Sequence, residues 1–195
     1  MEYYCIIYKP FNVLSQFTSQ EGKQTLKDYF EVPKDVYPVG RLDYDSEGLL
    51  LLTNDKKLNH ALLHPSNEHT REYWVQVDGS ITEAAIQQLQ QGVVITVEGK
   101  QYKTKKCIVT LFNGAPRVPE RNPPIRFRKN IPTSWIRMKL TEGKNRQVRK
   151  MTAAAGFPTL RLIRFSIDKI TAEGLEPGEM RLLDKKEVYK IISKS

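Results

Sequence analysis

The sequence predicts an α+β domain built on a mixed, mostly antiparallel sheet with flanking helices. Segments in which apolar and polar residues alternate, such as 71–78 and 135–141, predict half-buried strands. Apolar residues three and four apart, as in 85–89, predict an amphipathic helix. Strands and helices do not alternate strictly, which disfavours a parallel sheet of β–α–β units. The 195 residues suffice for one large domain or two lobes that share a core.

The first part of the chain predicts short strands around one buried strand. An apolar strand is expected at 3–8 and a second strand at 13–17. A short helix is expected at 25–30, stopped near Pro33. The four leucines at 49–52 are too few for an independent helix and therefore predict a buried strand.

Two helices are marked by their ends. Asp55 is a suitable N-cap for a helix that must end at Pro65. Ser80 with Glu83 forms a possible capping box for a second helix, which Gly92 closes.

The second half predicts a hairpin, a basic helix and further strands. Strands at 93–97 and 101–111 are expected to pair across a turn at 98–100. A helix at 145–155 has its C-cap at Gly156. The remaining elements are two strands and a C-terminal helix, at 135–141, 159–165 and 184–192.

Positive charge is concentrated in one stretch of the chain. Lys and Arg number 31 against 22 Asp and Glu, for a net charge of +9. Residues 117–164 hold thirteen of these basic residues and only two acids, Glu120 and Glu142. Within 112–134, prolines accompany arginines, which predicts a mobile basic loop between strands. A basic band neutralises phosphates, so we favour a nucleic-acid partner over a merely solvated surface.

The remaining composition disfavours several other classes of protein. Cys5 and Cys107 lie in apolar stretches and are expected to be buried free thiols. The three histidines within 60–69 lack further zinc ligands close in sequence. No signal-peptide pattern opens the chain and no apolar run approaches ~20 residues, so we expect a cytoplasmic protein without membrane association.

Acidic residues gather beside the most apolar run. Residues 40–55 place Asp43, Asp45 and Glu47 before the four leucines. One interpretation is a solvated turn with local side-chain to backbone bonds. A second is a Mg²⁺ site, and a third is a single catalytic carboxylate, Asp43, kept ionised by Arg41. Periodicity and charge are compatible with all three.

A longer pattern around these residues resembles a known family. Gly40-Arg41-Leu42-Asp43, followed by Ser46 and residues 48–55, is similar to the signature of the RsuA/RluB/RluE/RluF family of bacterial ribosomal RNA pseudouridine synthases. Further segments resemble the other motifs of the family in the same order, at 8–15, 71–75, 142–151, 160–164 and 175–178. The resemblance covers about residues 3–190 and is strongest to the short RluE type.

The resemblance implies a pseudouridine synthase fold with two lobes around a catalytic cleft. The catalytic domain would span residues 1–190, with lobes at about 1–68 and 69–190 and without the S4 RNA-binding domain of larger members. The implied reaction is isomerisation of uridine to pseudouridine in ribosomal RNA, most closely large-subunit (23S) rRNA, on a flipped-out nucleotide. No cofactor or metal is expected. The expected partner is a ribosomal RNA stem-loop or an rRNA-containing particle, bound by a monomer.

The resemblance also assigns roles to individual residues. Asp43 is the nucleophile that attacks either the ribose C1′ or the uracil C6, Tyr73 packs against the base, and Arg149 pairs with the aspartate. Arg71 stands where the family usually has Lys and keeps the charge. The residues expected to bind the RNA are Arg41, Lys9, Arg71, Lys144, Asn145, Arg146, Arg126, Arg128 and Leu162.

Two alternatives stay open on the sequence alone. A non-catalytic RNA-binding or ribosome-assembly module would share the basic features, although it would not need Asp43, Tyr73 and Arg149 together. The same reaction on small-subunit rRNA or tRNA is compatible with every residue named.

Overall fold

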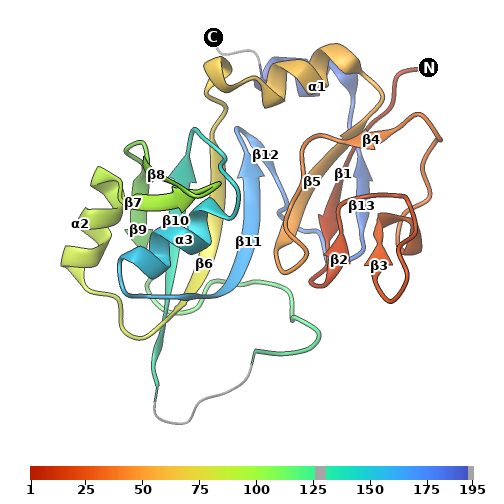
Figure 1. The fold of residues 1–195 in the computed structure, drawn as a ribbon. Helices are drawn as coiled ribbons and strands as arrows, with labels where there is room; N and C mark the ends of the chain where they lie inside the picture. Colours follow the sequence, from red (N-terminus) through yellow and green to blue (C-terminus); the bar gives the residue numbers. More distant parts are fainter. Residues whose placement is uncertain (126–130, 193–195) are drawn as a thin grey trace. The chain divides into compact units, whose positions relative to one another are not determined.

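The computed structural model describes residues 1–125 and 131–192, and the chain divides into two compact units (Figure 1). Unit 1 is Met1–His69 with Ile163–Ser195, and unit 2 is Thr70–Leu162. The division after His69 lies within one residue of the predicted lobe boundary. Residues 163–190, however, group with the N-terminal segment, because the C-terminal strands pair with N-terminal ones.

Unit 1 contains a four-stranded sheet with two further short strands on it. Its elements are β1 (Tyr4–Lys9), β2 (Val13–Leu14), β3 (Gln24–Thr25), the 3-10 helix η1 (Leu26–Asp28), β4 (Tyr37–Pro38), β5 (Glu47–Thr53), α1 (Lys56–Leu63), the 3-10 helix η2 (Pro65–Asn67), the C-terminal part of β11 (Thr159–Ile167), β12 (Ile170–Thr171), β13 (Met180–Leu182) and α4 (Lys185–Ile192). The sheet order is β13, β1, β5 and β11, with β4 paired to β5 and β12 to β11. In this sheet only the pairing of β11 with β5 is parallel.

The central strand β5 is buried along its whole length, as predicted from its leucines. Leu50 and Leu52 share a core cluster with Cys5 and Ile7 of β1. A strand covered on both faces needs no polar alternation, which explains the continuous apolar run. A Cβ on Gly48 would lie 2.4 Å from a backbone oxygen of β11, so the close pairing of these strands requires glycine.

Two short elements of unit 1 differ from the prediction. The strand expected at 13–17 is limited to β2, and the helix expected at 25–30 is the single turn η1. The amide of Thr25 donates to the Asp28 carboxylate at 2.7 Å, and the Thr25 hydroxyl lies 3.0 Å from it. These contacts complete one turn locally, and the helix does not continue beyond it.

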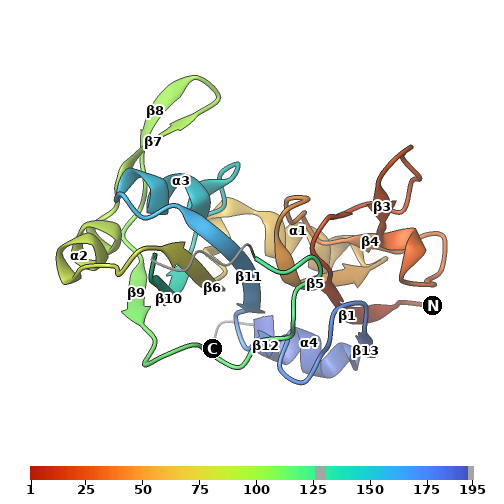
Figure 2. The same cartoon turned by 90° about the horizontal axis from the view of Figure 1, so that it is seen from below.

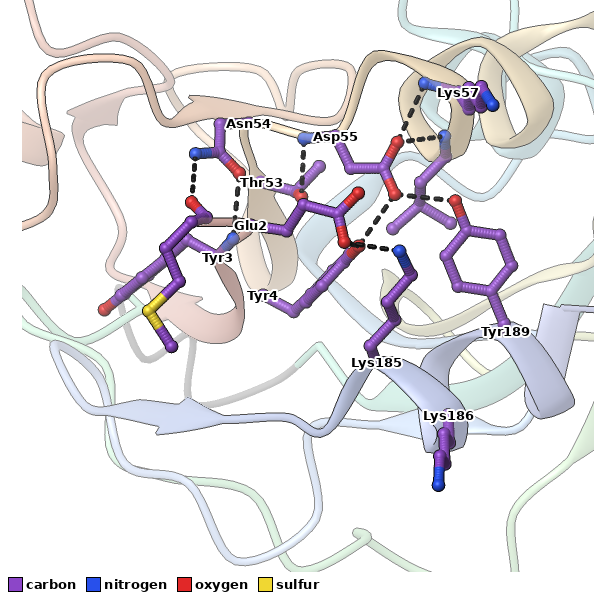
Figure 3. A network of polar contacts seen from close by, with 12 residues as sticks. Glu2, Tyr3, Tyr4, Thr53, Asn54, Asp55, Lys57, Lys185, Lys186 and Tyr189 are labelled. Carbon is purple, nitrogen blue, oxygen red and sulfur yellow. Dashed lines mark hydrogen bonds and ion pairs between the residues drawn. The ribbon is translucent and has the colours of Figure 1, made fainter.

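The carboxylate of Asp55 joins three elements of unit 1 (Figure 3). It caps α1, as predicted, by accepting from the amides of Lys57 at 2.9 Å and Leu58 at 3.2 Å. It also accepts from the hydroxyls of Tyr4 on β1 at 2.7 Å and Tyr189 on α4 at 2.6 Å. Burial alone would raise the pKa of Asp55, but the hydrogen bonds from the two tyrosines and the two amides lower it overall.

Unit 2 has a three-stranded antiparallel sheet and a separate hairpin. Its elements are β6 (Arg71–Asp78), α2 (Glu83–Gln91), β7 (Val94–Val97), β8 (Lys100–Lys103), β9 (Ile108–Leu111), β10 (Thr133–Leu140), α3 (Gln147–Ala154) and the N-terminal part of β11. The sheet order is β6, β10 and β9, and β7 pairs with β8. The predicted α+β class with a mostly antiparallel sheet is confirmed.

The alternation in β6 and β10 separates two faces as predicted. Val75 and Val77 of β6 and Met138 of β10 lie in the core cluster of unit 2 together with apolar residues of α2 and α3. Glu72 and Trp74 lie on the opposite face, where the Trp74 indole donates to the Glu72 carboxylate at 2.8 Å.

Two predictions for unit 2 are wrong in detail. The strand expected at 101–111 is two strands, because the chain turns away at Thr104, whose amide donates to the carbonyl of Val93 at 2.9 Å. The later strand, β9, then pairs with β10 instead of β7. The N-cap of α2 is Thr82, whose hydroxyl accepts from the Ala85 amide at 3.2 Å, and not Ser80. Both residue types cap helices well, so spacing alone could not decide between them.

Both cysteines are free thiols, as predicted, but only Cys5 is fully buried, whereas Cys107 is half-buried. Burial raises the pKa of Cys5 to about 12 and that of Cys107 to about 11, which keeps both protonated at neutral pH. Across residues 1–125 and 131–192, the helices are too short or too polar to cross a membrane.

Candidate functional site

Asp43 lies in a tight turn that leads directly into β5. The amide of Ser46 donates to the carbonyl oxygen of Asp43 at 3.0 Å, which closes the turn. Asp43 is half-buried, and Ser46 and Glu47, where the strand begins, are each 1% exposed. The turn is therefore attached to a rigid strand, which is the support that a precisely placed reactive group requires.

A second segment, just after β1, holds this turn on both sides of Asp43. The hydroxyl of Ser15 accepts from the amide of Leu42 at 3.0 Å and donates to the carbonyl of the same residue at 2.8 Å. The amide of Asn12 donates to the carbonyl of Tyr44 at 2.9 Å. The residues before and after Asp43 are thus both fixed through their backbones.

Lys9 supports the same turn from inside the fold. It is 0% exposed, and its ammonium donates to the carbonyls of Pro10 at 2.8 Å and Val13 at 2.7 Å, with Tyr44 O at 3.5 Å. Burial lowers the pKa of Lys9 to about 7, while the carboxylate of Glu47 acts most strongly in the opposite direction. This burial corrects the expectation that Lys9 binds RNA, because a sealed ammonium cannot reach a phosphate.

The other carboxylates near Asp43 do not form a metal site with it. Within the described parts of the chain, no group of three or more His, Cys, Asp and Glu side chains is arranged to hold a metal ion. The Mg²⁺ interpretation of Asp43, Asp45 and Glu47 therefore has no structural support. Arg41 is exposed, as a residue that meets RNA must be.

Unit 2 carries the other candidate residues on β6 and α3. Tyr73 and Arg71 are half-buried on β6, opposite Met138 and Leu140 of β10, and Tyr73 packs against the core of the unit. Arg149 is half-buried on α3, which Val148 and Met151 anchor in the same core. Leu162, at the end of the unit, is 5% exposed in that core.

The loop before α3 is organised around Glu142. Its carboxylate accepts from the Lys105 amide at 2.8 Å, from the Gln147 side-chain amide at 2.6 Å and from the Tyr102 hydroxyl. The Lys144 ammonium lies 5.0 Å from the centre of the Tyr102 ring, a cation–π contact.

This network leaves the basic residues of the loop at the surface. Lys144, Asn145 and Arg146 are all exposed, as residues that bind a phosphate backbone must be. Arg146 caps α3 with a φ of +52°, a conformation that few side chains adopt.

The structure thus distributes the predicted residues over both units. Asp43 and Arg41 belong to unit 1, whereas Tyr73 and Arg149 belong to unit 2. Arg126 and Arg128 lie outside the described residues. The sequence patterns predicted no role for Ser15 or Asn12. The available signal was their position in a motif that precedes the aspartate motif in the same order as in the family.

Comparisons with known proteins identify the family of this chain. Residues 3–154 match the family model described as RNA pseudouridylate synthase. The chain is 50% identical over 176 residues to "Ribosomal large subunit pseudouridine synthase E" of Vibrio parahaemolyticus serotype O3:K6 (strain RIMD 2210633), which covers 90% of this chain and 71% of that protein. It is 44% identical over 185 residues to the protein of the same name from Xanthomonas campestris pv. campestris, covering 94% and 96%.

A solved structure is similar as well. The structure described as "Crystal structure of pseudouridylate synthase" matches with a TM-score of 0.79 and 25% identity, covering 98% of this chain and 74% of that one. Together with the family match over residues 3–154, this leads to one conclusion. The chain belongs to the RNA pseudouridylate synthase family and is an RNA pseudouridine synthase.

Proposed function

We propose that this protein converts a specific uridine of large-subunit (23S) ribosomal RNA into pseudouridine. The observation that carries the proposal is the clamped turn of Asp43, which fixes one half-buried carboxylate at the start of a rigid strand. The choice of large-subunit RNA is supported by the names of relatives that are 44% to 50% identical to this chain.

In the proposed reaction the Asp43 carboxylate is the nucleophile. It bonds to the ribose C1′ or to the uracil C6, the glycosidic bond breaks, the uracil turns, and its C5 bonds to C1′. The bond between Asp43 and the nucleotide then breaks, which restores the free carboxylate. A proton leaves C5 and one is taken up at N1, so the product is an isomer of the substrate. No electron or group is lost, and the reaction needs no carrier.

The residues of unit 2 are proposed to complete the site. Tyr73 packs against the target base, and Arg149 pairs with the Asp43 carboxylate during the reaction. Arg41 fills the space that the flipped uridine leaves. Extrusion of a base costs a few kcal/mol, so we expect a uridine in a loop or bulge, where that cost is lowest.

The binding partner and setting belong to the same proposal. We expect the protein to act as a monomer on a ribosomal RNA stem-loop or an rRNA-containing particle in the cytoplasm. The exposed basic residues Lys144 and Arg146 support contact with a phosphate backbone.

The proposal is tested on the RNA itself. Purified protein is incubated with a transcript of large-subunit ribosomal RNA, and pseudouridine is mapped by carbodiimide treatment and primer extension. We expect one new stop, at a position that also loses its stop in ribosomal RNA from cells lacking the gene. If deletion removes no pseudouridine from any ribosomal RNA, the proposal is wrong, and the RNA-binding module without catalysis becomes the better interpretation. Loss of a site in small-subunit RNA or tRNA would correct the substrate alone.

A further inference from the structure

The β7–β8 hairpin of unit 2 combines a rigid frame with a high density of lysines. Residues 100–106 contain four lysines and no acid. The strands pair from Val94 opposite Lys103 to Val97 opposite Lys100, and Glu98 and Gly99 form the turn with φ of +50° and +78°. Two positive φ values are those of the tight turn that best fits the twist of a hairpin. Figure 2 shows the hairpin standing out beyond α3.

One face of the hairpin is used for packing. Ile95 is 4% exposed, and Val97 and Tyr102 pack against the core of unit 2. Because side chains alternate along a strand, Lys100 projects on the same side as Tyr102, about 7 Å along the strand. The hairpin is thus held firmly at its base, and its tip presents a lysine to solvent.

The Glu142 network joins this hairpin to the loop before α3. The Tyr102 hydroxyl and the Lys105 amide both donate to the Glu142 carboxylate, and the Lys144 ammonium lies 5.0 Å from the Tyr102 ring centre. Lysines far apart in sequence are therefore brought to one place. The hairpin surface is defined here as the exposed basic residues Lys100, Lys105, Lys106, Lys144 and Arg146. Lys103 is exposed as well but is left out of this set, because its ammonium donates to the carbonyl of Gly92.

We propose that the hairpin surface binds the phosphate backbone of the substrate RNA outside the nucleotide that reacts, an inference that rests on the proposed function. Exposed ammonium groups on a fixed frame suit sequence-independent phosphate contacts, whereas the reading of a base would need planar side chains at the tip. The hairpin therefore contributes affinity and register, and it leaves the selection of the uridine to the catalytic site.

The test replaces the three lysines that residues 100–106 contribute to the hairpin surface together by glutamine, in Lys100→Gln/Lys105→Gln/Lys106→Gln. Binding to a transcript of large-subunit ribosomal RNA is measured by filter retention between about 50 and 200 mM salt. Each lost phosphate contact lowers the slope of log Kd against log salt by roughly 0.7 to 0.9, so we expect a decrease of about 2 to 3. The control Lys27→Gln/Lys34→Gln/Lys169→Gln removes the same charge at exposed positions of unit 1 and should keep the wild-type slope.

Two further arms keep the test decisive. A Lys→Arg triple variant at the same three positions keeps the charge and should restore the slope, and thermal unfolding confirms that each variant is folded. An unchanged slope in the glutamine variant, or an equal decrease in the control, overturns the inference. Failure of the proposed function looks different: the wild-type protein would form no pseudouridine, even if its binding to RNA depends on the hairpin.

Discussion

Two aspartates stand at opposite ends of β5, and the fold uses them in opposite ways. At the C-terminal end of β5, the carboxylate oxygens of Asp55 accept hydrogen bonds from two tyrosine hydroxyls and two backbone amides (Figure 3). At the near end, the fold holds Asp43 by the backbone around it, through Ser15 and Asn12. Asp55 thus contributes to the fold through its carboxylate, whereas the turn of Asp43 is held by backbone groups of its neighbours, Leu42 and Tyr44.

The largest expected effect is the loss of activity in Asp43→Asn. The amide is not a nucleophile, so we expect pseudouridine formation to fall by more than ~10⁴-fold. The backbone contacts of the turn are kept, so the midpoint of thermal unfolding should be unchanged. The rate of pseudouridine formation is measured by the release of tritium from RNA that carries the label at uracil C5. Asp45→Asn, in the same turn, is the matched control and should retain activity; equal loss in both variants would contradict the assignment of Asp43.

The opposite result is expected at Asp55, where stability changes and chemistry does not. Asp55→Ala removes the N-cap of α1 and the acceptor for the hydroxyls of Tyr4 and Tyr189, which together should lower the free energy of unfolding by about 2–4 kcal/mol. Urea unfolding measures this change. Asp55→Asn keeps a capping oxygen and should lose less. If both variants unfold like the wild type, the network in Figure 3 contributes nothing to stability.

The ends of β5 also show what sequence reasoning can and cannot find. The cap at Asp55 and the buried leucines were predictable, because capping and burial depend on neighbouring residues. The burial of Lys9 was not, because lysine is almost always exposed, and here its ammonium is held inside the fold by the carbonyls of Pro10 and Val13. The turn at Thr104, which divides the expected strand into β8 and β9, also depends on tertiary contacts. Local alternation of apolar and polar residues therefore could not predict it.

The candidate site was predictable only through motifs. Charge and periodicity left three interpretations of Asp43, and the family resemblance selected one of them. No pattern predicted the clamp, which is the pair of hydrogen bonds between the Ser15 hydroxyl and the backbone of Leu42. These residues lie 27 apart in sequence, so the bonds exist only in the folded chain.

Ser15→Ala should remove the hydrogen bonds that hold the turn of Asp43 while leaving the Asp43 carboxylate in place. Loss of the hydroxyl frees the backbone of Leu42, and we expect kcat to fall about tenfold while KM for RNA stays the same, since positioning costs rate more than binding. Ser15→Thr keeps the hydroxyl and should restore kcat. Ser166→Ala removes another buried serine of unit 1 and controls for a general loss of stability. A kcat for Ser15→Ala equal to that of the wild type would show that the clamp does not position Asp43.

The smallest expected effect is the pH dependence of stability, which differs in cause between Asp55 at one end of β5 and Lys9, which supports the turn at the other end. The lowered pKa of Asp55 means that its contribution to stability is present above the usual value of 3.8 and is lost as the pH falls through the lower, folded-state value.

Lys9 differs in cause, since burial lowers its pKa from 10.5 to about 7 on folding. Between these values the unfolded chain binds a proton that the folded chain does not. Stability therefore rises as the pH increases above 7, by at most about 1.4 kcal/mol per pH unit. Urea unfolding of the wild type and of Lys9→Met from pH 6 to about 9 isolates this rise, because titration of the cysteines is common to both proteins. A difference between the two proteins that does not change with pH would mean that Lys9 stays charged in the fold, and that the turn of Asp43 rests on a buried cation.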